Sequence, residues 1–108
     1  MKIKYIYDEL LRVVSAAGIT VRKDALLRSR GGYCILEDNK LIILNKTLPI
    51  ESHSSILARC IGELNLNNSD IFIAPAVRDY IENEISNNVS VENVEFVIEK
   101  KQEESTEE

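Results

Sequence analysis

The stretch from Gly31 to Glu63 constrains the fold more than any other part of this chain. Two glycines open it, and apolar residues then run through Tyr33–Glu37 and again through Leu41–Asn45. Asp38-Asn39 lies between these runs and tolerates positive φ, which is typical of a hairpin turn. Pro49 follows and suits the first turn of a helix, where its missing N–H costs no hydrogen bond. The order predicts a β-hairpin followed by an amphipathic helix that ends near Leu64.

The second strand of this hairpin is expected to be central in its sheet. Its residues Leu41–Leu44 are all apolar, and a strand that is apolar on both sides is typical of one covered on both faces. The glycines in Arg30-Gly31-Gly32 precede a strand, not a helix, and lack the GxxxxGK[ST] pattern of a phosphate loop. They indicate a bulge or a close approach of two backbones.

The remaining elements follow from hydrophobic periodicity. Apolar residues recur at three- and four-residue steps in two further helices, and β-branched or alternating residues indicate two short strands. Gly18 is expected to end the first helix in a left-handed conformation. Residues 24–30 are compatible with a helical turn or a loop, and residues 89–98 favour a strand over a helix. The predicted helices are Lys4–Ala17 and Ala76–Ile85, and the predicted strands are Ile19–Val21 and Val94–Ile98.

Together these elements predict an α+β fold, with a small mixed or antiparallel sheet packed on one side by two or three helices. The chain has 108 residues, which suits one modest core. We expect a single domain over residues 1–98. The last ten residues contain five Glu, two Lys and no apolar residue. Such a segment buries too little surface to offset its ordering entropy, so residues 99–108 are expected to form a disordered acidic tail.

Composition narrows the cellular setting. The longest apolar run is four residues, far short of the ~20 that a membrane-spanning helix needs. No signal peptide is readable at the N-terminus. Two cysteines are too few for a disulfide framework. We therefore expect a cytoplasmic protein with reduced thiols and no membrane partner.

Charge is distributed unevenly along the chain. Residues 1–50 hold nine Lys/Arg and five Asp/Glu (net +4), whereas residues 51–108 hold four Lys/Arg and thirteen Asp/Glu (net −9). One interpretation is that the two halves share one surface and simply attract each other. Alternatively, four cations form a basic patch for a phosphate or an acidic partner. The negative net charge and the absence of a recognisable nucleic-acid-binding motif argue against a nucleic-acid partner. The four cations are Arg22, Lys23, Arg28 and Arg30.

A family resemblance adds a second line of inference. Gly18-Ile19-Thr20-Val21 is a G-I-x-V strand, Ile42–Asn45 is an I-x-x-N strand preceded by Gly32, and Ala58–Glu63 reads ARCIGE. In this order, Leu10–Leu64 resembles the front half of the ImmA/IrrE-type metallopeptidases, in which a zinc helix of the form A-H-E-L-G-H follows the hairpin. Here the zinc motif is degenerate. Arg59 replaces the first His, Cys60 the catalytic Glu, and Glu63 the second His.

These replacements remove the chemistry that the motif supports. Two imidazoles four residues apart on a helix hold one zinc ion, but Arg59 does not lose its proton and cannot be a ligand. Arg59 and Glu63 could instead form a weak ion pair on a solvated helix face, or contact a partner in a former active-site cleft. We expect no bound metal and no cofactor.

The remaining nucleophiles and bases form no obvious catalytic set. Cys60 lies on the apolar stripe of its helix and Cys34 lies in an apolar strand, so both are expected to pack in the core. His53 is seven residues before Cys60, ~10 Å away along a helix, and is expected to be exposed or to cap the helix. We therefore expect a non-enzymatic protein-interaction module that binds a protein partner or forms a homodimer. The alternatives are an enzyme that uses Cys60 or Cys34, and a phosphate- or nucleic-acid-binding module that uses the cations from Arg22 to Arg30.

Overall fold

The structure, a computed structural model, describes residues 2–26, 30–87 and 94–96. Its helices match the periodicity of the sequence within a few residues, and Gly18 ends the first helix at φ +83° as predicted. The helices are α1 (Ile3–Ala16), α2 (Ile50–Glu63) and α3 (Pro75–Asn87), with a short 3₁₀ turn, η1, at Leu66–Asn68. The strands are β1 (Thr20–Asp24), β2 (Gly31–Leu36), β3 (Asn39–Asn45) and β4 (Val94–Phe96).

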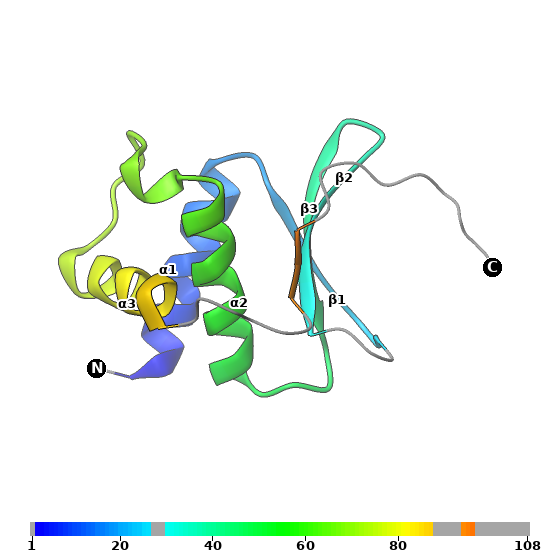
Figure 1. Cartoon of the computed structure of the whole chain (residues 1–108), viewed down its shortest axis with the longest axis horizontal. Helices are drawn as coiled ribbons and strands as arrows, with labels where there is room; N and C mark the ends of the chain where they lie inside the picture. The colour runs from blue at the N-terminus through cyan, green and yellow to red at the C-terminus, as the bar shows by residue number, and fades with distance from the viewer. Residues whose placement is uncertain (1, 27–29, 88–93, 97–108) are drawn as a thin grey trace.

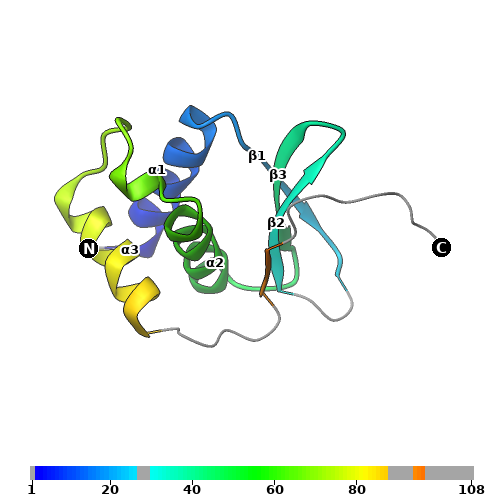
Figure 2. The same ribbon diagram turned by 45° about the horizontal axis from the view of Figure 1, so that its top comes forward.

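The strands form one mixed sheet in the order β1-β3-β2-β4. β1 runs parallel to β3, β2 runs antiparallel to β3, and β4 runs parallel to β2. All three helices lie on one side of this sheet (Figure 1), and a view turned by 45° shows the same separation (Figure 2). The predicted α+β fold, with helices packed on one side of a small mixed sheet, is confirmed.

The core lies between the sheet and α2 and continues between the helices. α2 contacts α1, α3, β2 and β3, which explains why buried residues surround most of its circumference. The close approach of α2 to α3 requires a glycine, because a Cβ on Gly62 would lie 2.3 Å from Cδ1 of Ile85. Residues with no exposed surface include Leu10, Val13, Val14, Ile42, Leu44, Leu57, Ile61, Val77 and Ile81.

The hairpin turn is one residue earlier than the sequence predicts. Leu36 pairs with Asn39, so Glu37 and Asp38 form a two-residue turn with φ of 53° and 70°. Positive φ at both positions matches the twist of the flanking strands. The close backbone approach expected at the glycine pair is present at Gly31, whose φ is +133° and whose added Cβ would lie 2.1 Å from the carbonyl oxygen of Ile43.

The other strand predictions differ in extent. β1 includes Arg22, Lys23 and Asp24 beyond the apolar Ile19–Val21, because these polar residues pair in register with β3. Val94–Phe96 is a strand, as favoured by the alternation. The rest of residues 89–98, the predicted acidic tail at 99–108 and residues 27–29 of the uncertain 24–30 segment lie outside the described residues. No helix in the described part of the chain is long and apolar enough to cross a bilayer.

The central strand has two different faces. Ile42 and Leu44 point toward the helices and have no exposed surface, whereas Leu41 and Ile43 point the other way. Residues opposite each other in the register share a face, so Tyr33 lies under the helices and Cys34 on the outer face. β3 is central, as predicted, but within residues 2–26, 30–87 and 94–96 only one of its faces is covered by helices.

Candidate functional site

The sheet ends at β1, whose outer edge is unpaired among the described strands. The carbonyl oxygen of Asp24 accepts a hydrogen bond from the N–H of Lys46 at 2.9 Å. Backbone groups alternate in direction along a strand, so the N–H and C=O groups of Thr20, Arg22 and Asp24 point toward β3. Those of Val21 and Lys23 therefore point outward. The edge offers two backbone donors and two acceptors to a further strand.

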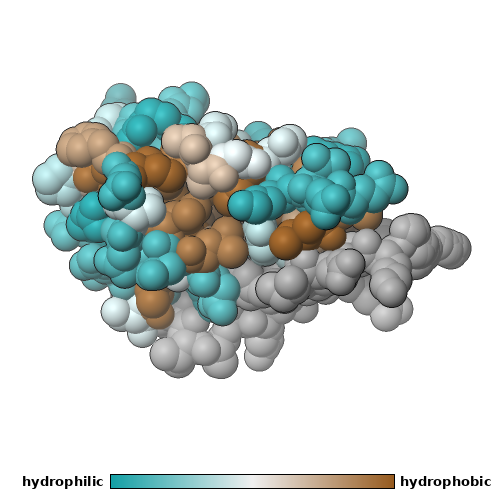
Figure 3. All heavy atoms as spheres, turned by 90° about the horizontal axis from the view of Figure 1, so that it is seen from above, coloured by the Kyte–Doolittle hydropathy of each residue, from teal (hydrophilic) through white to brown (hydrophobic). Residues whose placement is uncertain are grey.

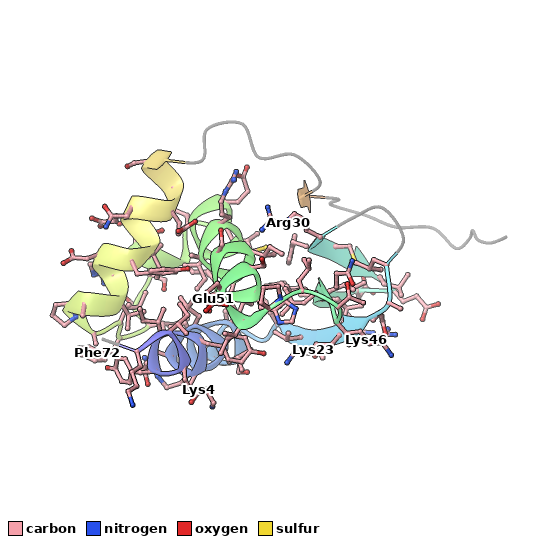
Figure 4. The ribbon with its side chains drawn as sticks, turned by 90° about the horizontal axis from the view of Figure 1, so that it is seen from below. Lys4, Lys23, Arg30, Lys46, Glu51 and Phe72 are labelled. Atoms are coloured by element: carbon pink, nitrogen blue, oxygen red, sulfur yellow. The ribbon has the colours of Figure 1, made fainter. Side chains whose placement is uncertain are left out.

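Positively charged side chains border this edge on both faces of the sheet. Arg22 points to the outer face, 53% exposed, and its Nη2 lies 3.2 Å from Oδ2 of Asp24. Lys23 points to the helix side, with its Nζ 5.3 Å from the centroid of the Tyr7 ring. Lys46 is exposed immediately after β3, and Figure 4 shows Lys23 and Lys46 at the same end of the sheet. We call Arg22, Lys23 and Lys46 the basic edge.

The structure divides the basic patch that the sequence predicts. Arg22 and Lys23 are neighbours on β1, but Arg30 lies immediately before β2, apart from Lys23 and Lys46 (Figure 4). Arg28 lies outside the described residues. Lys46 was missed because it is 23 residues beyond Lys23 in sequence. Only the parallel pairing of β1 with β3 brings it to the end of β1.

Arg59 and Glu63, the other predicted partner-binding residues, do not act as a pair. No ion pair joins these two described side chains, and Glu63 is exposed. Nη1 of Arg59 is buried with no hydrogen-bond partner, so this part of α2 is not the fully solvated face that the sequence allows. Within the described part of the chain, no three His, Cys, Asp or Glu side chains are grouped so as to hold a metal ion.

His53 is neither exposed nor a cap of α2, so the expectation of an exposed or capping histidine was wrong. It retains 5% of its surface, and its Nε2 lies 2.7 Å from the backbone oxygen of Asn45. Because this backbone oxygen can only accept a hydrogen bond, Nε2 must carry the proton. The ring also lies 6.4 Å from the Tyr7 ring between centroids. His53 therefore fixes the start of α2 against the end of β3.

Asn45 is the centre of this polar junction. Its Nδ2 donates to the carbonyl of Leu26 at 3.0 Å, and its Oδ1 accepts from both the N–H and the hydroxyl of Thr47 at 3.1 and 2.8 Å. Its own N–H donates to the carbonyl of Arg30 at 3.0 Å. These bonds join Leu26, Arg30 and Thr47 to the end of β3, and the bond from His53 connects α2 to the same place.

The two cysteines lie on opposite sides of β2. Cys60 has no exposed surface, and burial raises its pKa to about 12, with Arg59 lowering it and Glu63 raising it by smaller amounts. Cys34 is 8% exposed on the outer face. Both residues are buried, as predicted, but only Cys60 belongs to the core cluster under the helices. A protonated, buried thiol is a poor nucleophile, and the sheet between the two sulfurs prevents a disulfide.

Comparison with known proteins adds no relative: no family model matches this sequence, and no curated protein or solved structure is significantly similar to it. Function must therefore be argued from the geometry of the site.

Proposed function

We propose that the protein is a non-enzymatic protein-interaction module of the cytoplasm, and that it binds an extended, acidic segment of a protein partner along β1. The observation that carries this proposal is the outward direction of the backbone groups of Val21 and Lys23. A strand added at this edge would gain hydrogen bonds from the backbone, as in other cases of β-augmentation.

The charge of the edge selects the partner. Arg22, Lys23 and Lys46 would attract glutamate or aspartate side chains on both faces of an added strand, which favours the encounter and fixes its register. Positive residues on an edge strand also repel a second copy of the same edge. Two β1 strands paired antiparallel about their centre would place Arg22 opposite Arg22. An acidic partner is therefore favoured over a homodimer at this edge.

The other candidate functions receive less support. An enzyme based on Cys60 would need a thiolate, which burial disfavours at neutral pH. A phosphate or nucleic-acid site would benefit from cations on one face, whereas Arg22 and Lys23 point to opposite faces. The order α1, β1, hairpin, α2 supports a further part of the proposal, that the chain is a reduced relative of the ImmA/IrrE-type scaffold with Arg59, Cys60 and Glu63 at the motif positions.

Peptide titration followed by amide NMR tests the proposed function. The probe is a peptide of alternating glutamate and valine, about eight residues long, so that it can form one added strand. We expect the largest chemical-shift changes at the backbone amides of Val21 and Lys23. The double variant R22E/K23E reverses the charge of the edge and should weaken binding at least about tenfold.

A second double variant controls for net charge. Lys2 and Lys4 are exposed at the start of α1, away from the basic edge, and K2E/K4E changes the net charge by the same amount. We expect it to bind the probe like the unchanged protein. Equal losses in both variants, or shift changes located away from β1, contradict the proposal. Tighter binding of an oligonucleotide than of the peptide would favour the nucleic-acid alternative.

A further inference from the structure

The basic edge has two different faces, and this difference can select the side chains of a bound strand. Hydrophobic groups appear in several places among hydrophilic ones on the surface (Figure 3), so an exposed apolar residue alone does not identify a contact site. At β1 the two kinds of side chain are sorted by the alternation of the strand. Val21 and Lys23 point toward the helices, because they pair in register with Ile42 and Leu44. A strand added beside β1 would meet each face separately.

The helix side of the edge is apolar beside Val21. Val21 is partly buried and packs against the core under the helices. Lys23 lies on the same face, but its Nζ is directed over the Tyr7 ring, 5.3 Å from the centroid. The methylene stem of this lysine therefore lies between β1 and α1, and the ring attracts the ammonium group. This face offers an added strand apolar surface beside a cation that already has a partner.

The outer side of the edge is charged. Arg22 is 53% exposed, and its Nη2 lies 3.2 Å from Oδ2 of Asp24, which is itself 40% exposed. One carboxylate does not use all five N–H donors of a guanidinium, so Arg22 can bind a second carboxylate from an added strand. Thr20, the other residue of β1 that points to this face, is exposed and polar. An apolar side chain placed here would gain little burial, whereas a carboxylate would gain an ion pair.

Side chains directly opposite each other on neighbouring strands lie on the same face, whether the strands run parallel or antiparallel. We infer that the edge selects a segment in which one acidic residue lies between two apolar residues. The carboxylate lies opposite Arg22 on the outer side, and the apolar side chains lie on the helix side, against Val21 and the stem of Lys23. This inference rests on the proposed function, which supplies the added strand, and it specifies which side of that strand is acidic.

Two peptides of the same composition and length test this arrangement. The peptide of alternating glutamate and valine can place all its valines on the helix side and all its glutamates on the outer side. A second peptide repeats Glu-Glu-Val-Val, so each of its faces carries both residue types in any register. With a glutamate opposite Arg22, the second peptide places only one valine on the helix side, opposite Val21 or Lys23. We expect the alternating peptide to bind at least about fivefold more tightly, because it buries one more valine side chain.

Val21→Thr tests the apolar position with little change in side-chain size. The new hydroxyl would have to lose water beneath a valine of the peptide, so the alternating peptide should bind about threefold more weakly. Thr20→Val is the matched control, because it makes the reverse change at the neighbouring position on the outer side, and it should bind the alternating peptide like the unchanged protein. The amide spectrum of each variant shows whether the fold is intact. Unchanged binding in Val21→Thr, or tighter binding in Thr20→Val, overturns the inference.

The two peptides also distinguish failure of this inference from failure of the proposed function. Equal affinity for both, with chemical-shift changes at the backbone amides of Val21 and Lys23, rejects the selection of apolar residues and keeps β1 as a binding edge for an acidic strand. Tighter binding of the Glu-Glu-Val-Val peptide at the same amides has the same meaning. Absence of binding by both peptides, or chemical-shift changes away from β1, rejects the proposed function and the inference with it.

Discussion

The two faces of the central sheet differ in how their side chains are held. On the helix side, Ile42 and Leu44 are enclosed by α2 and have no exposed surface. On the outer side, Leu41 and Cys34 are apolar and nearly buried, but no described helix lies over them. The helix-facing side is therefore a closely packed core. The outer side is an apolar surface beside the basic edge of β1, where no further described strand pairs.

We propose that stability and interaction depend on separate parts of the molecule. The helix face depends on close packing, which tolerates little change in volume. The basic edge contains exposed cations and the outward backbone groups of Val21 and Lys23. Substitutions on the two faces should therefore have different effects, and each prediction below tests that separation.

Gly31→Ala should have the largest effect, because it disturbs the backbone that both faces share. The new Cβ would lie 2.1 Å from the carbonyl oxygen of Ile43, and φ at this position is +133°. We expect a loss of about 4 kcal/mol or more in the free energy of unfolding, measured by urea denaturation. Gly18→Ala is the control, since φ there is +83° with no atom within 4 Å of the new Cβ. It should cost about 1–2 kcal/mol. Similar losses in both would show that the approach of β2 to β3 is not tight.

Leu44→Ala and Leu41→Ala compare the two faces directly. Leu44 has no exposed surface and belongs to the core under the helices, so its truncation should cost about 3–4 kcal/mol. Leu41 lies on the outer face outside that core, and its truncation should cost about 1–2 kcal/mol. Urea denaturation of the two purified variants measures both losses. Equal losses would mean that the outer face is as firmly packed as the helix face, and the proposed separation would fail.

These comparisons also show where the sequence was sufficient. The spacing of apolar residues locates α1 and α2, and the glycine that follows the apolar stripe of α1 marks its end at Gly18. The close approach of two backbones at Gly31 was also predictable, because a pair of glycines opens the strand. Such features depend on residues that are near one another in the chain.

The site also depends on residues that are distant in the chain, and the sequence does not show that they come together. Arg22-Lys23-Asp24 is polar, and it becomes a strand only because β3 supplies a partner. Lys46 reaches the basic edge through the same pairing. His53 is buried because the carbonyl of Asn45, eight residues earlier, accepts its Nε2–H. No periodicity in the sequence marks any of these contacts.

Proline substitution at adjacent positions of β1 tests the direction of its backbone groups. The N–H of Arg22 points toward β3, so Arg22→Pro breaks the sheet and leaves an acceptor unpaired. The N–H of Val21 points outward, where proline is tolerated on an edge strand. Arg22→Pro should therefore be about 1–2 kcal/mol more destabilising than Val21→Pro, by thermal or urea unfolding. Val21→Pro should still weaken binding of the glutamate-valine peptide. The reverse order of stabilities would place the open edge on the other set of residues.

The smallest expected effect concerns the thiol under the helices. Burial raises the pKa of Cys60 from an ordinary value of 9.0 to about 12, so the folded protein keeps a proton that the unfolded chain loses above pH 9. The unfolded state then binds fewer protons, and stability falls as pH rises from 9 toward 12. By pH 10 the free energy of unfolding should drop by about 1 kcal/mol more in the unchanged protein than in Cys60→Ala. Urea denaturation at pH 8 and pH 10 measures both drops. Tyr80, whose pKa is also raised to about 12 by burial, titrates in both proteins and cancels in the difference.

Cys34→Ala is the matched control, because it removes the thiol of the outer face and keeps that of Cys60. It should retain the part of the drop that comes from Cys60. If the drop disappears in Cys34→Ala and persists in Cys60→Ala, the buried and the accessible faces have been assigned to the wrong sides of the sheet.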